Sequence, residues 1–303
     1  MTDVSGITVT AAPGKLTKKH LDLTFQLGTG AFGDSGFNTM TIKGLRASVS
    51  ISKAGGNFLS EMNLRVWGMT QEVMNQLSGT GDDIVSQRRN LITVSAYADG
   101  QTPAIVFQGN INQCWPDYSG APDVALAVSA LSVVFQALAP ATPNSFPTGV
   151  NVATFLGNIA TQIGYTFTNN GVNTILPPSY FVGSLPAQAF ECAKHANIRM
   201  IFDDGQLAIW PPGGERLSPS NTEIIISRET GMIGYPAWAQ GGIMIRSEFN
   251  PAVKFGYTMV VQSDITPAEG DWNIFNLNMI LESEMPDGKW EMAIQATKLG
   301  QPS

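Results

Sequence analysis

The chain has 303 residues, of which 43% are hydrophobic and only 14% are charged, against the roughly 25% charged residues usual in globular proteins. This length is enough for about two domains with sizeable cores, and the scarcity of charge predicts that much of the surface is covered in an assembly. A net charge of −7 excludes a general electrostatic attraction to nucleic acid. The first ten residues lack basic and apolar segments, so we expect no signal peptide.

Residues 1–20 are predicted as an N-terminal arm and residues 21–140 as a first β domain. The stretch "LDLTFQL" (21–27) alternates apolar and polar residues, which is the pattern of a half-buried strand, and similar runs follow it. The alternation slips by one residue at Gly44, which predicts a β-bulge. The stretch "MTQEVMNQLS" (69–78) has a single apolar face and predicts one short helix. Long strands with one helix favour a closed antiparallel β-barrel.

Residues 147–213 are predicted as a small α+β module that follows a proline-rich linker at 139–149. Asn151 and Ser184 are each placed to cap a helix with one apolar face. The stretch after the second helix predicts a hairpin that turns at Asp204-Gly205.

Residues 214–303 are predicted as a second β domain, separated from the module by "PPGG" at 211–214. Several alternating runs follow, of which "KWEMAIQAT" (289–297) is the most regular. The fold class predicted from all these patterns is mainly β, with two antiparallel β-barrel domains and the α+β module between them.

The stretch "LGTGAFGDSG" (27–36) matches two enzyme motifs, a phosphate-binding glycine loop and the serine motif of trypsin-like proteases. A strand and not a helix follows it, and the chain lacks the H-R-D and D-F-G elements of kinases. His20 is the one histidine before Ser35, and it is so close to Ser35 that no room is left for the first barrel of a trypsin-like protease. We therefore predict a flexible hairpin loop without chemistry, ordered against a neighbouring subunit, at Gly28, Gly30, Gly33 and Gly36.

The remaining reactive side chains predict no catalytic residue, cofactor or metal site. Cys114 and Cys192 are expected to be reduced thiols, and two histidines are too few for a histidine-rich metal site. The pairs Asp82-Asp83 and Asp203-Asp204 are expected in solvated turns. A general acid/base pair remains open, since such carboxylates meet only in the fold, and the candidates are Glu282 and Glu284.

The last third of the chain resembles the baseplate hub proteins of tailed bacteriophages. The stretch "TGMIGYPAWAQGGIMIRSEFNPAVKFGYTMVVQS" (230–263) has their T-G-x-x-G-x-P segment and F-N-P turn, and the glycine that opens the next strand. Glu248 stands where relatives commonly have an apolar residue. The order of segments in the first half is similar too. The motif residues in this chain are Gly231, Gly234, Pro236, Phe249, Asn250, Pro251 and Gly256.

The resemblance implies two tail-tube-like barrels per chain and a homotrimer, which places six barrels in a pseudo-sixfold ring. Such a ring joins the hexameric tail tube, or a tube-initiator protein, to the trimeric central spike, and contacts other baseplate proteins. The genome passes through it, so DNA is present only in transit, without specific binding. The implied location is the virion tail baseplate, after synthesis in the bacterial host cytoplasm, with no membrane insertion.

Two other classes of protein remain open. One is a related structural part, such as a tube initiator or the spike of a type VI secretion system. The other is a hub-associated enzyme that degrades the cell wall, which would need an inserted catalytic domain. For a hub, we expect the module on the outside of the ring and a lumen poor in Lys and Arg. The clustered basic residues should then face neighbouring proteins or solvent, and they are Lys15, Lys18, Lys19, Arg88 and Arg89.

Overall fold

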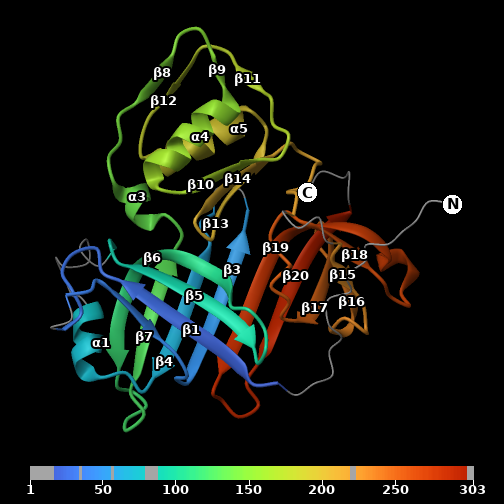
Figure 1. The fold of residues 1–303 in the computed structure, drawn as a ribbon. Coiled ribbons are helices and arrows are strands. Elements are labelled where there is room, and N and C mark those ends of the chain that lie inside the picture. The colour runs from blue at the N-terminus through green and yellow to red at the C-terminus, as the bar shows by residue number, and fades with distance from the viewer. Residues whose placement is uncertain (1–16, 34–35, 56–57, 79–87, 219–222, 299–303) are drawn as a thin grey trace.

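The computed structural model describes residues 17–33, 36–55, 58–78, 88–218 and 223–298. They form one large, almost wholly antiparallel sheet with a small α+β module on top of it (Figure 1). The predicted fold class, mainly β with a small α+β module, is confirmed. Most of the predicted N-terminal arm, Lys15, Ser35 and the pair Asp82-Asp83 lie outside the described residues.

The first half of the chain folds its strands over one another, so that β1 and β5 cross in front of β3 and β4 (Figure 1). The bulge predicted at Gly44 is wrong, because the chain turns there from one strand to another with φ +68°. The two strands flanking this turn have different partners, β1 for β2, and β4 and β19 for β3. The elements are β1 (Lys19–Gln26), β2 (Thr39–Ile42), β3 (Ala47–Ala54), β4 (Glu61–Trp67), α1 (Gln71–Leu77), β5 (Leu91–Ala98), β6 (Ala104–Asp117) and β7 (Ala125–Leu131).

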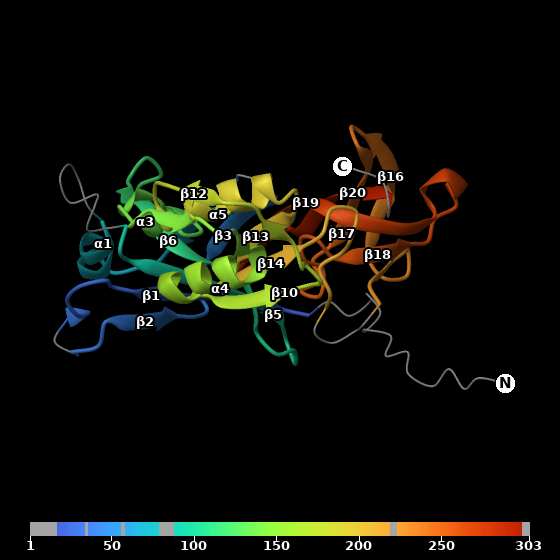
Figure 2. The same cartoon turned by 90° about the horizontal axis from the view of Figure 1, so that it is seen from above.

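The module has its own hydrophobic core between two helices and a small sheet. Asn151 caps α4 (Val152–Ile163) as predicted, since its Oδ1 accepts a hydrogen bond from Thr154 N at 3.0 Å. From above, the module lies over the middle of the large sheet (Figure 2). Its elements are α3 (Val134–Leu138), β8 (Asn144–Phe146), β9 (Val150–Asn151), α4 (Val152–Ile163), β10 (Thr166–Asn169), β11 (Ile175–Leu176), β12 (Ser179–Phe181), α5 (Leu185–His195), β13 (Arg199–Asp203) and β14 (Gln206–Trp210).

The second half continues the sheet of the first half. The hydrogen-bonded path runs β16-β17-β20-β19-β3-β4-β7-β6-β5-β1-β2. Along one side β19 pairs with β20, and along the other side it pairs first with β18 and then with β3. The elements are β15 (Ile225–Ile226), β16 (Met232–Ala239), β17 (Gly242–Glu248), β18 (Thr258–Val261), a 3-10 helix (Thr266–Ala268), β19 (Gly270–Ser283) and β20 (Trp290–Lys298).

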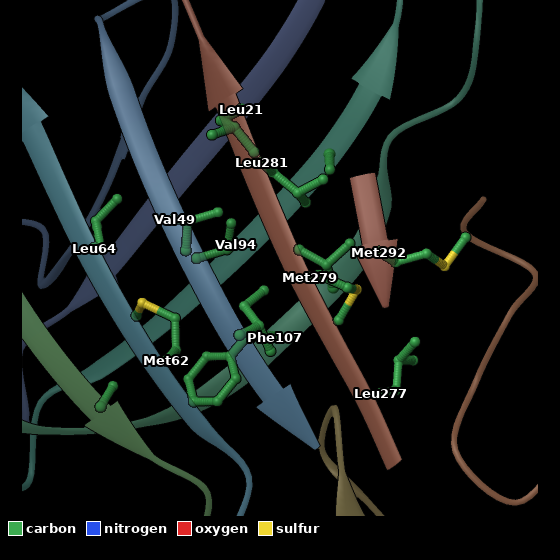
Figure 3. Packing of buried hydrophobic residues seen from close by; sticks show 14 of the residues in the cluster. Leu21, Val49, Met62, Leu64, Val94, Phe107, Leu277, Met279, Leu281 and Met292 are labelled. Atoms are coloured by element: carbon green, nitrogen blue, oxygen red, sulfur yellow. The ribbon is translucent and has the colours of Figure 1, made fainter. Parts of the chain in front are cut away.

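A single hydrophobic core extends through both predicted β domains. Figure 3 shows Leu281 and Met279 of β19 beside Val49 of β3, with Phe107 of β6 packed among the same side chains. The two halves are thus joined by backbone pairing and by shared apolar packing. The predicted domain boundaries stay a prediction.

Candidate functional site: a neutral sheet face and a buried charge cluster

The side of the sheet opposite the core carries short, uncharged polar side chains on strands from both halves. Charged side chains lie among them on the same side, and these are Glu61, Arg65, Arg246, Glu282 and Glu291. Directly paired residues point to the same side of a sheet, and the register aligns Ser50 with Asn63, Asn63 with Ser129, and Ser50 with Ile280. We call this surface the neutral face. It is defined by Ser48, Ser50, Ser52, Asn63, Ser129, Asn276, Asn278 and Gln295.

The polar groups of the neutral face bond to one another and to neighbouring carboxylates, as Asn63 Nδ2 does to Glu61 Oε1 at 2.9 Å. Asn276 Nδ2 donates to Gln295 Oε1 at 3.4 Å, and Asn278 Nδ2 donates to Asn276 Oδ1 at 3.3 Å. Ser48 Oγ donates to Glu282 Oε1 at 3.1 Å. These bonds between neighbouring side chains leave fewer hydrogen-bond donors directed toward solvent.

Arg65 and Arg246 lie on the same side of the sheet as the neutral face, and both are paired with carboxylates. Arg65 Nη2 lies 3.1 Å from Asp117 Oδ2, and Arg246 Nη2 lies 2.6 Å from Glu291 Oε2. A guanidinium that already binds a carboxylate offers less attraction to a phosphate. The surface therefore lacks the unpaired basic groups that hold nucleic acid.

Four of the five predicted basic residues are described: Lys18 directly precedes β1, Lys19 begins it, and Arg88 and Arg89 precede β5. Lys18 Nζ pairs with Glu284 Oε1 at 2.8 Å, and Lys19 Nζ donates to Thr17 Oγ1 at 3.3 Å. The guanidinium of Arg89 lies over the ring of Phe135.

A buried charge cluster lies where the module meets both halves of the sheet. We call it the junction cluster, and its members are Lys53, Asp203, Asp204, Arg216 and Lys254. Lys53 Nζ binds the carboxylates of Asp203 and Asp204, and Arg216 Nη1 donates to Asp203 Oδ2 at 2.7 Å. Lys254 Nζ donates to Asp204 Oδ2 at 2.9 Å. The tip of the β13–β14 hairpin is therefore tied to β3 and to the second half.

Mutual attraction favours the charged forms of Asp203 and Lys53. Burial alone raises the pKa of Asp203, but the attraction of Lys53 and then of Arg216 outweighs it, so this pKa is well below its usual range. Burial lowers the pKa of Lys53, but Asp203 and Asp204 outweigh it, so the net shift is upward. The cluster joins the module, the first half and the second half of the chain by ion pairs.

The prediction that Asp203-Asp204 form a solvated turn is wrong. The hairpin turn is present as predicted, but its tip is inserted at the junction, where Asp203 is 1% exposed. The overlooked signal is Lys53, which follows Ala47, Val49 and Ile51 in the inward-facing series of β3. A charged residue in a buried position requires a buried partner of opposite charge.

The first group of predicted motif residues shapes the edge of the second half. The carbonyl of Gly231 accepts bonds from Glu248 N at 2.8 Å and from Ser247 Oγ at 3.1 Å. Gly234 and Pro236 lie in the irregular stretch of β16, where the register with β17 shifts. Glu248 is exposed at the end of β17.

The second group forms the turn between β17 and β18. Phe249 packs edge-on against Trp290, and Asn250 Oδ1 accepts a bond from Ala252 N just beyond Pro251. Gly256 has φ +83°, and a Cβ there would lie 2.8 Å from the ring of Trp210. This turn therefore positions Lys254 and Gly256 against the module. A functional role for the motif residues stays a prediction.

The glycine loop joins β1 to β2 as the predicted hairpin. Gly28 N donates to Asn90 Oδ1 at 2.9 Å, and Gly28 is so close to Arg89 that a Cβ there would clash. Gly30, Gly33 and Gly36 have positive φ. The predicted contact with another subunit stays a prediction.

The two glutamates left open as an acid/base pair each have another partner, and a catalytic role for them stays untested. Glu282 accepts a bond from Ser48, and Glu284 pairs with Lys18. Burial raises the pKa of Cys114 and that of Cys192 to about 12, so both thiols stay protonated at neutral pH. Within the described residues, no group of His, Cys, Asp and Glu could hold a metal ion, and no helix has the length and apolar character to cross a membrane.

Solved structures with similar folds come from phage tails and secretion systems. The tail protein of Neisseria meningitidis MC58 matches with a TM-score of 0.61 at 12% identity, over 92% of this chain and 96% of that one. The 43 kDa tail protein of prophage MuSo2 from Shewanella oneidensis matches with a TM-score of 0.56 at 10% identity, over 91% and 96%.

The c3393 protein of E. coli, described as a type VI secretion component similar to the T4 phage tail proteins gp27 and gp5, has a TM-score of 0.57. It is 10% identical, and the match covers 86% of this chain and 76% of that one. No curated protein sequence matches this chain. The family model described as baseplate hub gp41 matches residues 21–287, and the chain therefore belongs to the baseplate hub gp41 family.

Proposed function

We propose that the protein is the structural hub of a phage baseplate, and that three copies form a pseudo-sixfold ring between the hexameric tail tube and the trimeric central spike. Each chain contributes its two β halves to the ring, and the ring allows the genome to pass. Membership of the hub family supports the role in the tail. The observation that carries the proposal is the neutral face, because it extends over strands of both halves.

The neutral face has the chemistry that the wall of a DNA channel needs. Duplex DNA has one negative charge per roughly 1.7 Å of its axis, so a wall of free Lys and Arg would hold it through many phosphate contacts. Serine, asparagine and glutamine side chains that bond to one another provide no such attraction. Paired Arg65 and Arg246 contribute little. The duplex therefore slides.

In this proposal the protein has no enzymatic activity and needs no cofactor. Its partners are its own copies, the tail tube or tube-initiator protein, the central spike and other baseplate proteins. It is made in the host cytoplasm and carried in the virion tail. The small α+β module lies on the outside of the ring in this proposal, and its β13–β14 hairpin meets the sheet at the end of β3 (Figure 1).

A second candidate is a tube initiator or a hub of a type VI secretion-like machine. The similarity of fold to the c3393 protein supports this second candidate. The two roles differ in their partners, because a phage hub is incorporated into virions and a secretion hub is not.

Light scattering on the purified protein, combined with electron microscopy of single particles, tests the proposal. We expect a particle of three chains with a central opening and six similar lobes. A ring of six chains would favour a tube component. A protein that stays monomeric at high concentration would contradict the hub and the tube component alike.

A further inference from the structure

We propose that neighbouring copies join head to tail, with Tyr235 and Trp238 of one copy held in an apolar cavity beside β2 of the next. The inference rests on the proposed ring and names the contact that closes it. The two surfaces lie at opposite ends of the strand path, β16 at one end and β2 at the other. Seen from above, these strands are on opposite sides of the molecule (Figure 2).

Each end of the path has a free edge. In the described part of the chain, β16 pairs only with β17, and β2 pairs only with β1. Free edges usually carry charged residues, a proline, a bulge or a very short strand, which prevent pairing with other chains. β16 has Pro236 and a register shift, and β2 has only four residues, so neither edge is suited to extended strand pairing. Neither strand has a charged residue, so a contact at these edges depends on side chains.

The edge strand β16 exposes two aromatic side chains. Trp238 is 68% exposed and Tyr235 is 64% exposed. Tryptophan and tyrosine dominate the binding energy of protein interfaces when they enter a closely packed pocket. Exposed rings on an uncharged edge make this strand the side of the contact that inserts its side chains.

The opposite end has a cavity of matching character. It is an open hollow with a volume of about 420 Å³, and it lies between Phe32, Gly33, β2 and α1. This size falls within the range of roughly 300–1,000 Å³ in which pockets hold molecules larger than an indole ring. Its apolar walls come from Phe32, Phe37, Met40 and Val73, and its polar groups include Glu72 and Gln76.

The polar groups in the cavity complement the aromatic pair. A buried indole N–H or phenol O–H needs a hydrogen-bond acceptor. The side-chain oxygens of Glu72 and Gln76 supply acceptors within an otherwise apolar site. Two different surfaces of one chain that fit each other give a heterologous contact between copies. Such a contact closes into a ring when the rotation per subunit permits.

Mass measurements on variants test this contact. Trp238→Lys should raise the dissociation constant for assembly at least about thirtyfold, as substitution of a hot-spot aromatic does. Val73→Lys should do the same from the cavity side. Gln76→Trp fills the cavity from an exposed position, so it tests the site even if Val73→Lys fails to fold. The matched control is Tyr180→Lys, which replaces an exposed aromatic residue of the module and should leave the mass unchanged.

Disulfide trapping gives a second measurement that does not disturb the aromatic pair. Chains with Ala237→Cys, mixed with chains with Gln76→Cys, should form a covalent dimer on oxidation, whereas unmixed chains should not.

If the wild type assembles and Trp238→Lys assembles equally well, or if mixed chains form no covalent dimer, the contact is wrong and the proposed function survives. If the wild type itself stays monomeric, the proposed ring fails first.

Discussion

Lys53 on β3 and Asp203 at the end of β13 form a buried ion pair, although 150 residues separate them in the sequence. Arg216 binds the second oxygen of the same carboxylate. The pair therefore joins the module to the first half of the sheet. Arg216 lies in the segment that leads from the module to the second half, so its bond to Asp203 fixes that segment at the same place. Removing one charge would leave another buried without its full set of partners.

Substituting Lys53 by Met should destabilise the protein strongly. We expect a loss of about 3 kcal/mol in the free energy of unfolding, the lower end of the range for breaking a buried pair, because Arg216 still binds Asp203. Urea denaturation measures this loss. The control is Lys18→Met, which breaks an exposed pair with Glu284 and should leave the unfolding curve almost unchanged. Equal effects of the two substitutions would show that the junction cluster is not structural.

Acid should weaken the junction cluster. The folded pKa of Asp203 lies below its unfolded value of about 3.9, so its contribution to stability is complete above about pH 4 and is lost as the pH falls through the folded pKa. The difference in unfolding free energy between wild type and Asp203→Asn should therefore be largest near neutral pH and shrink below about pH 4. A difference that stays constant from pH 7 to pH 2 would contradict the ionised cluster.

Replacing Gly256 by Ala should cost more than replacing Gly234. Both have positive φ, so each alanine pays about 1–2 kcal/mol for a left-handed backbone. At Gly256 the added Cβ also meets the ring of Trp210, whereas at Gly234 it has free space. Thermal unfolding should rank wild type, Gly234→Ala and Gly256→Ala in decreasing order of stability. The reverse order of the two variants would refute the close packing at the module.

Lysines on the neutral face should create DNA binding that the wild type lacks. We expect no measurable duplex binding by the wild type at physiological salt, and salt-sensitive binding after substitution of Ser50, Asn63 and Asn278 by Lys. Fluorescence anisotropy at several salt concentrations measures both. The control has the same added charge on α4, with Lys at Asn158, Thr161 and Gln162. Strong binding by the wild type, or equal binding by both triple variants, would argue against the neutral face as the wall of the channel.

Local patterns predicted the elements that depend on neighbouring residues. The alternation in "KWEMAIQAT" matches β20, in which Met292, Ile294 and Ala296 are buried. The hairpin turn at Asp204-Gly205 and the cap at Asn151 also follow from local backbone preferences.

The pairing of β3 with β19 could not be predicted in this way. Both strands alternate regularly, so their patterns fit many partners, and the register depends on contacts between distant segments. The junction cluster was missed for the same reason. Lys53 signalled a buried charge, but nothing local identified Asp203, Arg216 or Lys254 as its neighbours.

The position of β19 between the two halves has a consequence for the newly made chain. Ala54 at the end of β3 pairs with Asn276 of β19, 222 residues later in the sequence. At roughly 5–20 residues per second, a ribosome needs about 10–40 seconds to supply that partner. During this time the edge of β3 is open to pairing with other nascent chains. Synthesis rate and chaperone capacity of the producing cell should therefore limit how much correctly folded protein accumulates.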